Sequence, residues 1–131
     1  MTIEAALYTY LSTYAGLIAL TNDRIYPGQI PEKRDMPAVS VFLIDDPPIH
    51  AGGADATVYQ PRFQFTCWGS SYKNACDVAT QVKAALRDYS GTMGGEGGVV
   101  VQRSFYEGAT DIYNEERERE ARALDFIIWH E

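Results

Sequence analysis

The chain has 131 residues, of which 46% are hydrophobic and 12% aromatic. This is enough apolar material for one domain with its own core, spanning residues 1–131, and it argues against intrinsic disorder. The formal net charge of −7 provides no general attraction to phosphates, so a protein that grips nucleic acid is not expected.

The N-terminal segment predicts a helix over residues 3–14. Its apolar side chains recur at helical spacing and form one stripe. Thr2 is placed to cap the start of this helix and Gly16 follows its end. Prolines and a glycine make regular structure unexpected over residues 21–37, except for a short extended piece at residues 24–26 that we expect to pin the loop to the core.

Two strands follow. Residues 38–45 are β-branched and aromatic, as in a buried strand. Residues 57–68 alternate between apolar and polar side chains, which predicts a half-buried strand of an antiparallel sheet. A strand of this length is longer than the helix beside it, so we expect it to extend past the core.

The second half of the chain repeats this order. Residues 71–89 carry a continuous apolar face and predict the clearest helix. A glycine-rich turn, residues 92–98, leads to a strand over residues 99–106. A polar loop, residues 107–115, then leads to a fourth strand that ends near residue 130. No internal repeat is present.

These elements predict an α+β fold. The expected architecture is a single antiparallel four-stranded sheet with two helices packed on one face, in the order α-β-β-α-β-β. Its hairpins are expected to be long and to project from the body of the domain.

The charged run at residues 116–122 supports a projecting hairpin. In a strand, Glu116, Glu118 and Glu120 share a face with the apolar residues that follow. Carboxylates on that face would lie under the helices only at a large desolvation cost, so this half of the strand should extend beyond the core. The same residues also suit a short exposed helix, and both interpretations of residues 114–120 stay open.

The residues that could carry catalysis or bind a metal are scattered. His50 is in a Pro/Gly loop and His130 is the penultimate residue, and neither accompanies a nucleophile motif. Cys67 and Cys76 lack the paired spacing of a zinc site and are too few for a disulfide framework. We therefore expect no enzyme activity, no cofactor and no metal.

Targeting signals are also missing from these residues. The N-terminus lacks the basic segment and unbroken apolar run of a signal peptide. No apolar stretch approaches the roughly 20 residues that cross a membrane. We expect a protein that is made and assembled in the cytoplasm and has no membrane partner.

Nearly the whole chain resembles the phage tail completion family, also described as gp17-like. The resemblance is carried by residues 2–42 with their DRIYP segment, the strand-to-helix block at residues 62–86, the glycine turn at residues 91–102, and the aromatic last strand ending in Trp129-His130. These are core and turn positions, so they indicate the fold more strongly than any activity.

The resemblance implies a structural virion protein at the head–tail junction. Family members are expected to form a ring, typically a hexamer, that caps the tail tube and meets the head connector, with DNA passing through without specific binding. The expected partners are further copies of the chain, the tail tube protein and a connector or stopper protein. The alternatives are a head-closure (stopper) or other neck protein and, less favoured, a small enzyme or a DNA-binding module.

Two groups of candidate residues follow from the ring hypothesis. Projecting strands and tyrosine-rich rims suit a subunit interface. The interface candidates are Tyr59, Arg62, Glu116, Arg117, Glu118 and Arg119. An acidic lumen would repel phosphates and leave DNA mobile. The lumen candidates are Asp46, Asp55, Glu107 and Asp111.

Overall fold

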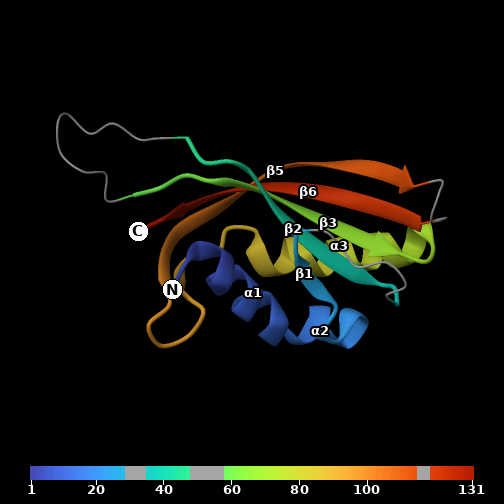
Figure 1. Cartoon of the computed structure of the whole chain (residues 1–131), viewed down its shortest axis with the longest axis horizontal. Helices are drawn as coiled ribbons and strands as arrows, with labels where there is room; N and C mark the ends of the chain where they lie inside the picture. Colours follow the sequence, from blue (N-terminus) through green and yellow to red (C-terminus); the bar gives the residue numbers. More distant parts are fainter. Residues whose placement is uncertain (29–34, 48–57, 115–118) are drawn as a thin grey trace.

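The computed structural model describes residues 1–28, 35–47, 58–114 and 119–131, and it shows a curled sheet covered on one face by helices (Figure 1). The helices are α1 (Ile3–Thr13), α2 (Ala15–Thr21) and α3 (Tyr72–Leu86). The strands are β1 (Ile25–Pro27), β2 (Ala38–Asp45), β3 (Arg62–Gly69), β4 (Gly91–Met93), β5 (Val99–Asn114) and β6 (Arg119–His130).

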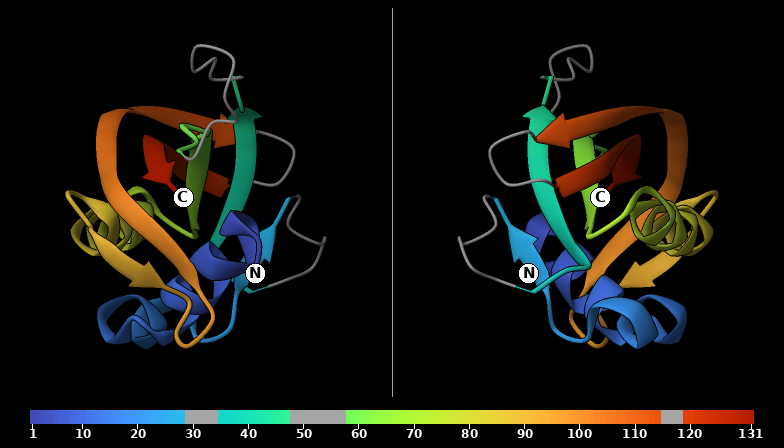
Figure 2. Two further views of the ribbon diagram at one scale, coloured as in Figure 1. Left: turned by 90° about the vertical axis from the view of Figure 1, so that its left-hand side faces the viewer. Right: turned by 90° about the vertical axis from the view of Figure 1, so that its right-hand side faces the viewer.

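The six strands form one mixed sheet in the order β1-β2-β3-β6-β5-β4. Only β1 and β2 are parallel, and the other neighbours are antiparallel. The sheet curls into a half-barrel, seen end-on in Figure 2, and its helices lie on the concave side. Helix α1 contacts both edge strands, β1 and β4, so it closes the open side of the half-barrel.

Local sequence signals explain where the helices begin. The Thr2 hydroxyl accepts a hydrogen bond from the Ala5 amide at 3.2 Å, which caps α1. The Ser71 hydroxyl does the same for α3, accepting from the Asn74 amide at 3.2 Å. Each cap satisfies one of the backbone donors that a helix start leaves free.

The core lies between the concave face and the helices. On β3 and β6 it contains Phe63, Phe65, Leu124 and Phe126, which are almost completely buried. The aromatic rings of Phe65 and Phe126 meet edge to face with their centroids 5.6 Å apart. Helix α3 packs its buried valines, alanines and leucine on this layer. The alternation predicted for residues 57–68 therefore identified the buried face of β3 correctly.

The predicted four-stranded, two-helix architecture is wrong. The sheet has six strands and is mixed, and the described residues contain three helices. The short extended piece predicted at residues 24–26 overlaps β1, which pairs with β2. Only Tyr14 separates α1 from α2, because the chain turns to extended geometry at this residue and then resumes helical geometry.

The largest error concerns residues 107–114, predicted as a loop. They continue β5, because β6 supplies an antiparallel partner from Arg119 onward. Gly108 adopts a φ of +139° at a register shift, so the apparent turn signal marks a bulge within the strand. Gly91–Met93 form a short strand, β4, which pairs with the start of β5, while the glycines at 94–98 lie in the turn between the two strands.

The expected overhang of the strands is also wrong for most of their length. Strand β3 pairs with β6 from Arg62 to Gly69, and it pairs with β2 on its other side from Arg62 to Trp68. Strand β6 pairs with β3 from Glu120 onward, so Glu120 lies within the sheet. Arg119 and Glu120 are strand, whereas residues 115–118 lie outside the described residues.

Candidate functional site

None of the three described helices lies on the convex face of the sheet, and this face exposes large apolar side chains. We call Phe42, Arg62, Phe105, Ile127 and Trp129 the convex-face patch. Phe42, Phe105 and Trp129 are 39%, 37% and 36% exposed, respectively. Aromatic residues and arginine are the types enriched at protein–protein interfaces.

The strand register places the patch residues side by side. Arg62 of β3 is paired with Ile127 of β6, which is paired with Phe105 of β5. Phe105 and Trp129 contact each other with ring centroids 5.7 Å apart. Arg62 lies 3.8 Å from the Asp125 carboxylate on the same face, a half-exposed ion pair. The patch is therefore a continuous surface across three central strands and reaches β2.

A second surface lies where α1 meets the end of the sheet. Tyr59 stacks on His130 with ring centroids 5.3 Å apart, and the two residues exchange backbone hydrogen bonds. Asp46 and Glu4 line a groove with this pair. Next to it, Tyr8 and Leu43 border a smaller apolar pocket. We call this region the α1 groove.

At the other end of the β5–β6 hairpin, three polar side chains form a closed network. The Arg122 guanidinium donates to Asp111 Oδ1 at 2.7 Å and to the Tyr72 hydroxyl at 2.7 Å. The Tyr72 hydroxyl in turn donates to Asp111 Oδ2 at 2.9 Å. The hydrogen bonds from Arg122 and Tyr72 hold the pKa of the Asp111 carboxyl below its usual value. This network fastens the hairpin to the start of α3, and its contribution is modest because the groups are exposed.

The structure distributes the predicted interface residues over separate places. Arg62 belongs to the convex-face patch and Tyr59 to the α1 groove. Arg119 begins β6, but its side chain is not among those described. Glu116, Arg117 and Glu118 lie outside the described residues.

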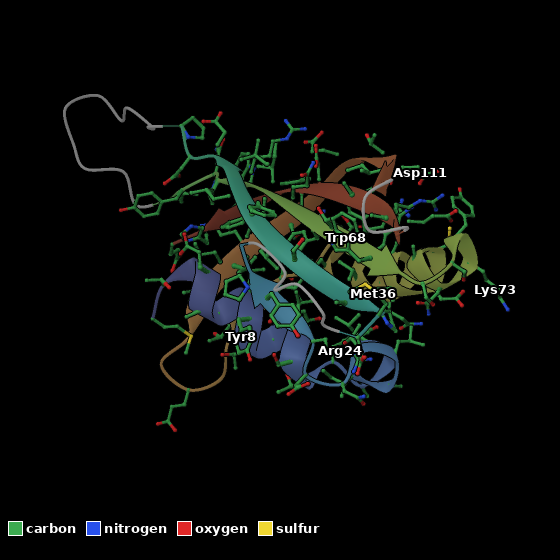
Figure 3. The ribbon with its side chains drawn as sticks, turned by 45° about the vertical axis from the view of Figure 1, so that its right-hand side comes forward. Tyr8, Arg24, Met36, Trp68, Lys73 and Asp111 are labelled. Carbon is green, nitrogen blue, oxygen red and sulfur yellow. The ribbon has the colours of Figure 1, made fainter. Side chains whose placement is uncertain are left out.

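The predicted lumen residues are not gathered in one site either. Asp46 is exposed in the α1 groove, and Glu107 is exposed at the β5 bulge. Asp111 belongs to the network with Tyr72 and Arg122, and Figure 3 shows it at the upper right, away from Tyr8 of the α1 groove. Asp55 lies outside the described residues.

Two pairs of residues were not predicted from the sequence. Phe42 and Phe105 read as ordinary strand residues, and their exposure depends on which face the helices leave bare. Tyr72 and Arg122 gave no signal either, because they are 50 residues apart and meet only through the hairpin. The alternation of β6 places Arg122 beside buried Leu124, and a charge in that position is the one clue that a partner was required.

Among the described residues, no group of three or more His, Cys, Asp or Glu side chains is arranged to hold a metal ion. Cys67 is completely buried, and burial raises the pKa of its thiol, so it is a core residue without nucleophilic character. Within the same part of the chain, no helix combines the length and the apolar character needed to cross a membrane.

A solved structure shares this architecture. A chain of the structure described as "Virion of native gene transfer agent (GTA) particle" matches with a TM-score of 0.74 and 20% sequence identity, covering 98% of this chain and 93% of that chain. At this identity the match shows a shared fold. No curated protein matches the sequence significantly.

The sequence itself identifies the family. The family model described as "Tail completion protein gp17" matches residues 5–131, and the chain belongs to this family. It is therefore a structural protein of the tail of a phage or phage-like virion, as the resemblance implied. The fold and the exposed convex-face patch suit such a role, in which a subunit contacts other virion components.

Proposed function

We propose that the chain forms a closed ring, a hexamer, which caps the tail tube and joins the tail to the head connector. The observation that carries this proposal is the family match over residues 5–131. The convex-face patch supports it, because large apolar side chains on a helix-free sheet face are costly to leave in water and suit a subunit contact. The projecting hairpins expected from the sequence do not contribute to this argument.

The test is to make particles without the protein. Tails of uncontrolled length that fail to join full heads are expected, and the wild-type gene supplied in trans should restore both defects. Tails of normal length that remain unattached would instead indicate a head-closure or other neck protein. Normal, infective particles would refute any role in tail completion. Tail lengths and head attachment are counted by electron microscopy.

We also propose that DNA passes an acidic lumen. Asp46 and Glu107 are exposed, and neither belongs to an ion pair in the part of the chain that the structure describes. Asp111 contributes less, since Arg122 compensates its charge. Replacing Asp46 and Glu107 by lysine should slow DNA release, because basic side chains attract phosphates. Unchanged release kinetics from purified particles at low salt would contradict this proposal.

A further inference from the structure

Strand β5 has one backbone edge that is open over most of its length. Strand β4 pairs only with Val99–Val101. Ser104 then exchanges backbone hydrogen bonds with Asp88 and Tyr89, at 3.0 and 3.1 Å. From Phe105 onward, the described residues supply a partner on the β6 side alone. An open edge of this kind is a template for another strand.

Strand β2 has a second open edge on the opposite flank of the half-barrel (Figure 2). Strand β1 pairs with Val39–Val41, and the Gly28 amide adds a hydrogen bond to the Val41 carbonyl at 2.8 Å. Beyond this point β2 has only β3 as a neighbour among the described residues. The open part carries three consecutive exposed apolar side chains, Phe42, Leu43 and Ile44.

The two open edges occupy the same level of the sheet. Asp45 pairs with a residue of β3 that pairs with a residue of β6, and that residue pairs with Phe105, so Asp45 and Phe105 lie in one row across the sheet. By the same register, Phe42 lies in one row with Gly108. The segments Phe42–Asp45 and Phe105–Gly108 therefore face outward at equal height from opposite flanks.

We infer that the occupant of each edge is a second copy of this chain, so that β2 of one subunit lies beside β5 of the next. The strands β2-β3-β6-β5 are antiparallel throughout, and repeating this order places β5 of the next copy antiparallel to β2. Two different surfaces on opposite flanks make a heterologous contact, which closes into a ring by rotation. This inference rests on the proposed ring.

Gly108 gives the contact a specific feature. A Cβ at this position would meet nothing within 4 Å, so the surface beside the strand is empty. In the proposed contact, the Phe42 ring of one copy covers Gly108 of the next, an arrangement by which an aromatic side chain shields an edge glycine. Strand β2 has a bulge between Leu43 and Asp45. This bulge shortens the stretch over which β2 can pair with β5 of the next copy. Burial of Phe42 and its neighbours therefore contributes more to the stability of the contact than backbone hydrogen bonds do.

The test is disulfide cross-linking in particles that contain the variant Asp45→Cys/Phe105→Cys as the sole source of the chain. Within one subunit these positions are three strand spacings apart, about 14 Å, which is too far for a disulfide. Mild oxidation should therefore give a ladder of covalent oligomers that ends at the copy number of the ring. The control is Asp45→Cys/Val100→Cys, because Val100 is on the same strand where β4 covers the edge.

Two results would refute the β2–β5 contact without refuting the proposed ring. In the first, the variant is present in the particles but gives no ladder. In the second, the control pair gives the same ladder. Absence of the wild-type chain from purified particles would instead contradict the proposed function. A second variant, Phe42→Asp, should lower incorporation into particles about tenfold or more. Val100→Asp, at a similar exposure of 41% against 39%, should not, and equal effects of the two would also refute the contact.

Discussion

Replacing Phe126 by alanine tests the assignment of the two sheet faces. Phe126 is fully buried on the concave face. Its ring centroid lies 5.6 Å from that of Phe65 and 5.5 Å from that of Tyr106. Removing the ring leaves a cavity that the surrounding side chains fill only partly, because α3 and the neighbouring strands hold them in place.

The expected loss of stability follows from this burial. Truncation of a buried Phe to Ala costs about 3–5 kcal/mol of unfolding free energy. An unfolding entropy of roughly 2.1 cal/mol/K per residue gives about 0.28 kcal/mol/K for a chain of this length. The Tm should therefore fall by about 10–18 °C, measured as loss of far-ultraviolet circular dichroism on heating.

The matched control is Phe105→Ala. Phe105 is also a phenylalanine in the centre of the sheet, but it lies on the convex face, is 37% exposed and contacts Trp129. Loss of this aromatic contact costs about 0.5–1.5 kcal/mol beyond the lost burial, and no closed cavity is left, so its Tm should fall by clearly less than that of Phe126→Ala. Equal losses for the two variants, or a larger loss for Phe105→Ala, would show that the faces are assigned wrongly.

Four further outcomes are expected. The pKa of the Asp111 carboxyl is lowered in the folded state, so its contribution to folding stability is complete above its ordinary pKa and is lost as the pH falls through the folded-state pKa. The difference in urea-unfolding free energy between wild type and Asp111→Asn should therefore close below about pH 4. Tyr72→Phe should speed amide exchange at the far end of the β5–β6 hairpin, and unchanged exchange would contradict the fastening role. Gly69→Ala should destabilise by about 1–3 kcal/mol, measured by urea unfolding, because a Cβ there would meet the Ala75 backbone nitrogen at 2.4 Å. Buried Cys67 should resist a thiol reagent until the protein unfolds, while half-buried Cys76 reacts in the native state.

The sequence by itself determined those elements whose signals are local. The apolar stripe of α1 and its Thr2 cap, the eight residues of β2 and the buried face of β3 were all predicted close to their observed bounds. The family followed from the sequence as well, because its characteristic residues are core and turn positions spread along the chain. These features depend on periodicity and capping within a few neighbouring residues.

Only the tertiary structure decided the number of strands and the candidate interface. The strand β4, Gly91–Met93, has little intrinsic preference for extended structure, and it forms because β5 offers a hydrogen-bonding partner. Gly108 reads as a turn until β6 continues beside it and makes it a bulge. Phe42 and Phe105 are exposed because all the helices described lie on the other face. Strand pairing and helix placement are non-local, so no stretch of sequence contains them alone.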